Sequence, residues 1–296
     1  MGVHEGSRRG FGTARAVAAY ERGRPGYPPE AVAELVSVLA IGPGATVLDL
    51  AAGSGKLTRQ LLPAAAGLVA VEPSPAMREQ LAAAAPGVRV LEGTAEAIPL
   101  PDDSLDAVTV GQAFHWFDGP RALAELHRVL RPGGRLGLLW NVRDASVPWM
   151  ARITAIVDRH AGDTPRYRDG RWRTAFDASA DFTPLQVRRF PHRHELDREG
   201  LLDRFASISF VAALPDAARA SVLAEIEQVV EAEPSLAGSG PMLVPYRTDL
   251  FWAERRDSAD AGRASGSGSQ ASSSRSTGLT AGPRRRGGGA SRERCG

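Results

Sequence analysis

The chain has 296 residues, a single cysteine and a formal net charge of +2 at pH 7. This length is enough to bury the core of one large domain or two small ones. A single cysteine, Cys295, excludes a disulfide framework and a zinc site built from cysteines. No signal-type leader opens the chain and no apolar run approaches the ~18 residues of a membrane span, so we expect a cytoplasmic protein with no membrane partner.

The positive charge lies at the C-terminal end. Residues 257–296 hold seven arginines and three acidic residues, a net +4, which leaves 2 − 4 = −2 for residues 1–256. A folded body of this charge lacks the basic surface of a nucleic-acid-binding protein, so no nucleic-acid partner is expected for it. The composition of residues 257–296, rich in Gly, Ser and Arg, predicts a disordered tail, and residues 1–10 are expected to be flexible.

Strand and helix patterns alternate through the first half of the chain. In order, they predict helix 30–39, strand 46–50, helix 56–63, strand 68–72, helix 74–84, strand 88–91, strand 105–110, helix 119–130 and strand 135–141. Such alternation is typical of parallel strands joined by right-handed crossovers. An open α/β sheet with helices on both faces is therefore expected, with ligands bound beyond the carboxyl ends of its strands.

The alternation stops between residues 145 and 182, a stretch rich in aromatic residues and arginines. After it, the patterns predict strand 182–190, helices 197–207 and 215–231, and a last strand 242–252. We expect residues 11–256 to form one domain.

The turn after the first predicted strand carries the strongest functional signal. Residues 47–55 read Val-Leu-Asp-Leu-Ala-Ala-Gly-Ser-Gly, and a helical pattern follows them. Glycines such as Gly53 and Gly55 let the backbone approach a ligand closely, and the free N–H groups at a helix start favour polar or anionic groups. The turn therefore predicts the binding of a nucleotide-like cofactor.

Two phosphate-containing cofactors fit this turn poorly. A P-loop needs Gly-x-x-x-x-Gly-Lys-Ser/Thr, but Leu50 and Leu57 stand at the two ends of that pattern. A dinucleotide fingerprint needs a third glycine where Thr58 stands. Glu72 lies 72 − 53 = 19 residues after the first glycine of the turn, the spacing of a ribose-binding acid, so it does not discriminate between nucleotide cofactors.

Asp49 is the residue that discriminates. An acid at the end of the first strand would repel a pyrophosphate, whereas it suits a cofactor that has a cationic centre and no phosphate. S-adenosyl-L-methionine has a sulfonium, an α-amino group and a ribose diol, and it fits these requirements.

Five features, in this order and spacing, resemble the class I S-adenosylmethionine-dependent methyltransferases. They are residues 47–55, Glu72, residues 93–100, the strand 105–110 and the Leu-Arg-Pro-Gly-Gly of residues 130–134. Tyr20-x-x-x-Arg24-Pro25-x-Tyr27-Pro28 and residues 113–118 are similar to a small-molecule branch, methyltransferase type 11, that includes trans-aconitate methyltransferase-like enzymes. The resemblance implies a Rossmann-like, seven-stranded, open and mostly parallel sheet with helices on both faces. Residues 145–182 would then form an inserted substrate cap.

The resemblance also implies a set of cofactor-binding residues: Asp49, Ala51, Gly53, Gly55, Glu72, Thr94, Ala95, Glu96 and Gln112. Two of these positions depart from the family pattern. Ala51 stands where the superfamily often has a glycine, and Thr94 stands where many members carry an acid beside the adenine. For this reason the backbone of Ala95 and the side chain of Glu96 are included as adenine contacts.

Four further residues are candidates for the acceptor side. His115 is considered as a general base because neutral imidazole is available near pH 7, with substrate binding as the other role weighed for it. Trp116 could form an aromatic wall beside a cation. Tyr20 and Arg24, followed by prolines, are expected to fold over the cofactor as a lid, in which the guanidinium could pair with a carboxylate. The sequence offers no set of cysteine ligands and no convincing acid–histidine spacing, so no metal is expected.

The sequence predicts a methyltransferase that transfers the methyl group of S-adenosylmethionine to a small-molecule acceptor by in-line displacement. The reactive chemistry belongs to the cofactor, and the protein aligns the acceptor and excludes water. A nicotinamide-dependent oxidoreductase and a non-catalytic, cofactor-binding relative of the methyltransferases remain as alternatives.

Overall fold

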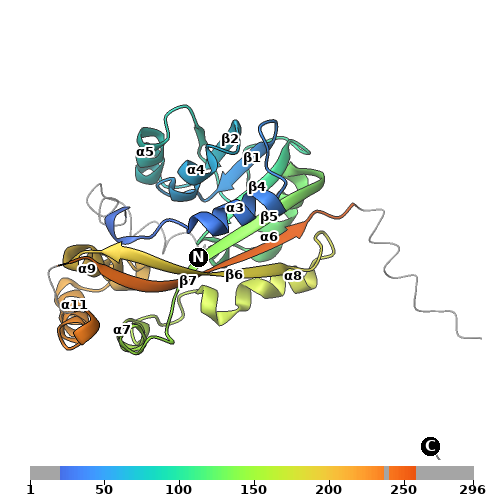
Figure 1. Cartoon of the computed structure of the whole chain (residues 1–296). Helices are drawn as coiled ribbons and strands as arrows, with labels where there is room; N and C mark the ends of the chain where they lie inside the picture. Colours follow the sequence, from blue (N-terminus) through green and yellow to red (C-terminus); the bar gives the residue numbers. More distant parts are fainter. Residues whose placement is uncertain (1–20, 237–239, 258–296) are drawn as a thin grey trace, which may run out of the picture.

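The computed structural model describes residues 21–236 and 240–257, and its strands form one seven-stranded sheet in the order β3-β2-β1-β4-β5-β7-β6 (Figure 1). The strands are β1 (Thr46–Leu50), β2 (Gly67–Val71), β3 (Arg89–Leu91), β4 (Leu105–Gly111), β5 (Leu130–Arg143), β6 (Gln186–Leu196) and β7 (Met242–Glu254). Neighbouring strands from β3 to β5 run parallel, whereas β7 runs antiparallel to both β5 and β6. The predicted open, mostly parallel sheet is confirmed.

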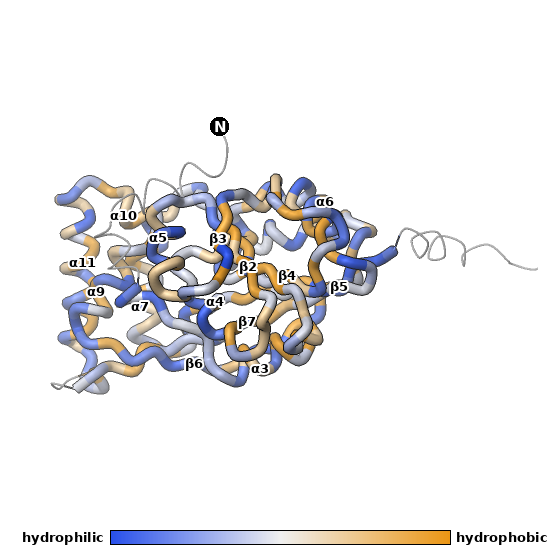
Figure 2. The backbone as a smooth tube through the Cα atoms, turned by 90° about the horizontal axis from the view of Figure 1, so that it is seen from above, coloured by the Kyte–Doolittle hydropathy of each residue, from blue (hydrophilic) through white to orange (hydrophobic). Residues whose placement is uncertain are grey.

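Helices cover both faces of this sheet. They are α3 (Pro29–Val38), α4 (Lys56–Leu61), α5 (Pro75–Ala84), α6 (Gly119–Val129), α7 (Pro148–Asp158), α8 (Thr174–Ala178), α9 (Arg198–Ala206), α10 (Ser209–Ala212) and α11 (Asp216–Glu231). Buried side chains of α3 and α4 pack against one face, and those of α6 and α8 pack against the other. The strands between these layers are strongly apolar, as the orange segments of Figure 2 show. Burial of both sheet faces explains why the strands read as continuous apolar runs.

Strand β6 starts at a different residue from the one expected, whereas β7 starts at Met242 as expected. The alternating pattern predicts a strand from residue 182, but β6 begins at Gln186. Pro184 has no N–H to donate to a ladder, so the regular strand begins after it. Phe182 is buried in the core and makes only an isolated bridge to Arg255.

A second apolar core lies at one end of the molecule. Here α7, α9, α10 and α11 gather beside the ends of β6 and β7 (Figures 1 and 2). The α7 helix belongs to the cap predicted from residues 145–182, whereas α9 to α11 form an additional excursion between β6 and β7. The sequence patterns indicated two helices in this region but gave no sign that they cover the ligand side of the sheet.

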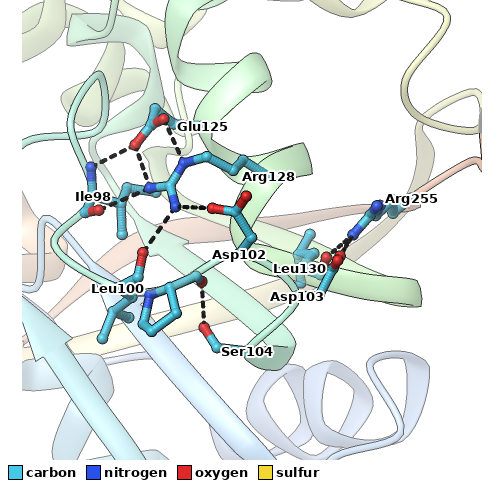
Figure 3. A network of polar contacts seen from close by, with 10 residues as sticks. Ile98, Leu100, Asp102, Asp103, Ser104, Glu125, Arg128, Leu130 and Arg255 are labelled. Atoms are coloured by element: carbon cyan, nitrogen blue, oxygen red, sulfur yellow. Dashed lines mark hydrogen bonds and ion pairs between the residues drawn. The ribbon is translucent and has the colours of Figure 1, made fainter.

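Helix α6 fixes the loop that joins β3 to β4 (Figure 3). The Arg128 guanidinium donates to the carbonyl oxygens of Ile98 and Leu100, each at 2.9 Å, and to both carboxylate oxygens of Glu125 at 2.8 Å. Asp102 accepts a further hydrogen bond at 2.7 Å. Hydrogen bonds between charged groups are among the stronger ones, so this network holds the loop firmly against α6.

None of the helices within residues 21–236 and 240–257 is long and apolar enough to cross a membrane. The flexible N-terminus expected for residues 1–10 lies outside the described residues, as does the tail beyond Asp257.

Gly55 provides a test of the turn after β1. Its φ of +85° is unfavourable for other residues, and an added Cβ would lie 2.9 Å from Leu81 Cγ. Gly87 has a φ of +93° with open space around it, so it serves as a control for backbone strain alone. We expect Gly87→Ala to lower the free energy of unfolding by about 1 kcal/mol and Gly55→Ala by about 2–4 kcal/mol, because overpacking adds to the strain. Equal losses in urea unfolding would contradict the packing described here.

Candidate functional site

A cavity of about 270 Å³ opens at the carboxyl ends of β1, β2, β4 and β5. This is where ligands bind on open α/β sheets. One part of its wall comes from the loops after β1, β2 and β3, and we call this part the cofactor half. The other part, which we call the acceptor half, comes from the end of β5, the end of α7, residues 164–168 and residues 208–210. A smaller cavity of about 50 Å³ lies beside it, next to Asp49.

The loop after β1 turns through three residues in the left-handed region of backbone space. Ala51 has φ +55°, Gly53 has φ +58° and Gly55 has φ +85°. An added Cβ on Gly53 would meet nothing within 4 Å, so its backbone is open toward a ligand. Ala51 adopts this conformation with a side chain, which costs about 1–2 kcal/mol and indicates that the surroundings hold the loop in place.

Glu72 holds this loop to the one that follows β2. One carboxylate oxygen accepts from the Gly53 N–H at 2.9 Å, and the other accepts from the Ser74 N–H at 2.8 Å. Burial raises the pKa of the Glu72 carboxyl, although these hydrogen bonds oppose the rise. Each oxygen keeps a second lone pair, and the residue lines the cofactor half of the cavity. The Glu72 carboxylate could therefore accept hydrogen bonds from the two hydroxyls of a ribose without losing either of its contacts with the loops.

Asp49 lies behind the loop. It is fully buried, and its two oxygens accept from the Thr58 hydroxyl at 2.6 Å and from the Thr109 hydroxyl at 3.2 Å. It lines the smaller cavity and not the larger one. Burial raises the pKa of Asp49 to about 7, with the threonine hydrogen bonds opposing the rise. The carboxylate lies where a cationic ligand group in the smaller cavity would stabilise its charged form.

His115 lines the larger cavity and is held by Trp140. The indole Nε1 donates to Nδ1 of His115 at 3.2 Å. Burial, and to a lesser extent the nearby Arg24, lower the pKa of His115 to about 4. The ring is therefore neutral at pH 7. Because an indole can only donate, the proton of the neutral ring is on Nε2, which makes that nitrogen a hydrogen-bond donor.

Most of the residues proposed from the sequence lie along the two cavities. The larger one is lined by Ala51, Gly53, Glu72, Thr94, Ala95, Gln112, His115, Trp116 and Arg24. Arg24 also lines the smaller cavity and donates from Nη2 to the Ser207 carbonyl at 3.0 Å.

Two of the proposed residues, Gly55 and Glu96, do not line either cavity. Gly55 caps the start of α4 and shapes the loop from behind. Glu96 accepts from the Asp118 N–H at 2.9 Å, next to the start of α6, and is not part of the cavity wall. Tyr20 lies outside the described residues.

Sequence reasoning missed several residues of the acceptor half. This half is lined by Arg143 at the end of β5 and by Arg204 and residues 208–210 of the excursion between β6 and β7. The only available signal was the placement of Arg143 at the end of a predicted strand, where ligand contacts are common. Within the part of the chain that the structure describes, no group of acidic residues, histidines or cysteines could hold a metal ion.

Asp49 makes the stability of the unliganded protein depend on pH. Its pKa rises from 3.8 in the unfolded chain to about 7 on folding, so the folded state retains a proton that the unfolded state releases. Stability therefore falls as pH rises from about 4 to 7. We expect Asp49→Asn to remove this fall. The free energy of unfolding of the variant, relative to that of the unmodified protein, should be up to about 4 kcal/mol higher at pH 8 than at pH 4.

Asp106→Asn is the matched control for this measurement. Burial raises the pKa of Asp106, but hydrogen bonds from Arg131 and from the Thr46 N–H outweigh it and lower the pKa overall. Its charged form therefore stabilises the protein above about pH 4, so the control should lose stability at neutral pH. Urea unfolding curves at several pH values measure both effects, and parallel pH curves for Asp49→Asn and the unmodified protein would contradict the account.

Comparison with known proteins agrees with the geometry of this site. A family described as a methyltransferase domain matches residues 48–138, which span β1 to β5. The chain is 43% identical over 233 residues to an uncharacterised methyltransferase of Mycobacterium tuberculosis, covering 79% of this chain and 91% of that protein. It is 34% identical over 240 residues to an uncharacterised methyltransferase-like protein of Schizosaccharomyces pombe, covering 81% and 93%.

The fold is also shared with solved structures. A protein described as a type II methyltransferase from Anaeromyxobacter dehalogenans has a TM-score of 0.56 and 28% identity, covering 78% of this chain and 96% of that one. The matches cover nearly the whole length of each of these relatives. They favour a methyltransferase over the nicotinamide-dependent alternative. The chain belongs to the class I S-adenosylmethionine-dependent methyltransferases, with S-adenosylmethionine as its cofactor.

Proposed function

We propose that this enzyme methylates a small molecule that binds in the acceptor half of the cavity. The observation that carries the proposal is that this half is bounded by two chain excursions. Residues 164–168 of the cap contribute to its wall, and so do residues 208–210 at the start of α10. Such walls favour a compact acceptor and help to exclude water, which is what a displacement at an activated methyl group needs from the protein.

The residues of the cofactor half fit S-adenosylmethionine. Glu72 would accept from the ribose hydroxyls, and the open backbone at Gly53 would admit the methionine end. Asp49, in the smaller cavity, would be stabilised as a carboxylate by the cofactor's ammonium or sulfonium. Thr94 and Ala95 would line the adenine side, in the loop that Arg128 holds. When bound, the cofactor supplies a methyl group already activated by its sulfonium.

His115 is proposed to bind the acceptor as a hydrogen-bond donor. A general base at this position would need Nε2 without its proton, whereas the Trp140 hydrogen bond places the proton there. Of the two roles weighed for His115 from the sequence, the geometry therefore favours acceptor binding. Trp116, whose ring centroid lies 5.3 Å from that of His115, extends the same wall of the cavity.

Methyl transfer gives the direct test of this function. We expect the enzyme to move the methyl group of isotopically labelled S-adenosylmethionine into the small-molecule fraction of a bacterial extract and not into its protein or RNA. Glu72→Gln should weaken S-adenosylhomocysteine binding about 10- to 100-fold, because a charged acceptor is lost. Glu92→Gln, at an exposed residue that follows β3, is the matched control and should bind normally. Label appearing in protein or RNA would overturn the proposal.

The protonation of His115 can be measured without knowing the acceptor. At pH 7, long-range ¹H–¹⁵N NMR spectra should show Nδ1 unprotonated and Nε2 protonated. Because the pKa is lowered to about 4, no titration is expected between pH 6 and 8. Trp140→Phe should remove the preference between the two nitrogens, since it removes the donor to Nδ1. An unprotonated Nε2 in the unmodified enzyme would support a general base instead.

A further inference from the structure

Arginines dominate the charge of the acceptor half. Five guanidinium side chains line the larger cavity: Arg24, Arg143, Arg166, Arg168 and Arg204. Among the described residues, the cavity wall holds two carboxylates, Glu72 in the cofactor half and Asp158 in the acceptor half. The acceptor half therefore carries a local excess of positive charge, although the chain as a whole is nearly neutral.

Asp158 is shared by three of these arginines. Its Oδ1 lies 3.5 Å from Nη2 of Arg143 and 3.6 Å from Nη1 of Arg166, and its Oδ2 pairs with Nη2 of Arg168. Arg166 also pairs with Asp169 Oδ1 at 3.2 Å, whereas Asp158 is the only carboxylate among the described residues that pairs with Arg143 and Arg168. One carboxylate cannot neutralise the charges of both guanidinium groups. Burial lowers the pKa of Arg143 to about 9, and the nearby Arg204 and Arg168 add to this effect by repulsion.

Arg204 is the buried member of the group. Its side chain lines both cavities, the residue is only 5% exposed, and its Nε donates to the Tyr246 hydroxyl at 2.8 Å. Its Nη1 is buried without a hydrogen-bond partner among the described residues. A buried, charged donor without a partner is costly, and an anionic group in the adjoining cavity would offset that cost.

We propose that the methyl acceptor carries an anionic group, a carboxylate or a phosphate, which Arg143, Arg168 and Arg204 bind. This inference rests on the proposed function, because it assigns the acceptor to the same half of the cavity. Guanidinium groups suit both anions, since their planar donors match the geometry of the oxygens. The residues that supply this site come from β5, the cap and α9, so all three must be in place before the anion can bind.

The methionine carboxylate of the cofactor is another anion that arginines of this cavity could bind. Arg24 and Arg204 line the smaller cavity together with Asp49 and Gly53, so they could reach the methionine end of the cofactor. Arg168 lines only the larger cavity, and its side chain is 39% exposed, so its replacement should leave the fold intact. Replacing Arg168 therefore distinguishes the binding of an anionic acceptor from the binding of the cofactor's carboxylate.

The test titrates the full chain with succinate, inorganic phosphate or uncharged succinamide by calorimetry at constant ionic strength. Each titration is run with and without saturating S-adenosylhomocysteine. We expect succinate or phosphate to bind and succinamide not to bind. Arg168→Gln should weaken anion binding about 10-fold or more, while leaving S-adenosylhomocysteine affinity unchanged. Arg152→Gln, at an exposed position of α7, is the control and should behave like the unmodified protein.

Three outcomes would overturn the inference. In the first, neither anion binds although S-adenosylhomocysteine does. In the second, both anions bind equally well to the unmodified protein and to the two variants. In the third, Arg168→Gln weakens the binding of S-adenosylhomocysteine as much as the binding of the anions. The last result would assign the arginines to the cofactor. A failure of S-adenosylhomocysteine to bind the unmodified protein would instead contradict the proposed cofactor site, and the titrations without it would still decide whether the arginines bind an anion.

Discussion

The ligand side of this protein depends on the carboxylate of Glu72, which joins the loops after two neighbouring strands. Its oxygens accept from Gly53 in the loop after β1 and from Ser74 in the loop after β2. The loop after β1 has three left-handed residues, and this link helps to hold its shape together with the Ala52 N–H, which donates to the Val71 carbonyl at 3.2 Å. The same carboxylate faces the cavity, and one side chain therefore both builds the cofactor half and offers acceptors to a ligand.

The larger cavity lies between two different kinds of structure. The parallel strands β1, β2 and β3 end in loops that the sheet and α6 hold in place, and these loops form the cofactor half. The acceptor half is formed largely by the cap and by the excursion between β6 and β7. Helix α7 of the cap and the excursion share the second apolar core (Figure 2), whereas Tyr167 of the cap packs against the core of the sheet. This division allows the acceptor half to vary among relatives while the cofactor half keeps its geometry.

The cofactor half could be predicted from the sequence because its signals are local. Asp49 lies near the end of one apolar strand, Gly53 and Glu72 follow apolar strands, and parallel strands bring their ends to one edge of the sheet. The acceptor half depends on contacts between distant segments, such as Trp140 with His115 and Arg204 with Tyr246. No local pattern encodes these pairs. Glu96 shows the same limit, since its partner is the start of α6 and not the cavity.

A crystal structure of the enzyme with S-adenosylhomocysteine would test the central claim most directly. The account predicts that both ribose hydroxyls lie within hydrogen-bond distance of Glu72 and that the sulfur points into the acceptor half, toward His115 and the arginines. The loop contacts of Glu72 with Gly53 and Ser74 should remain in place. A ligand whose ribose lies away from Glu72, or whose sulfur points away from the acceptor half, would contradict it.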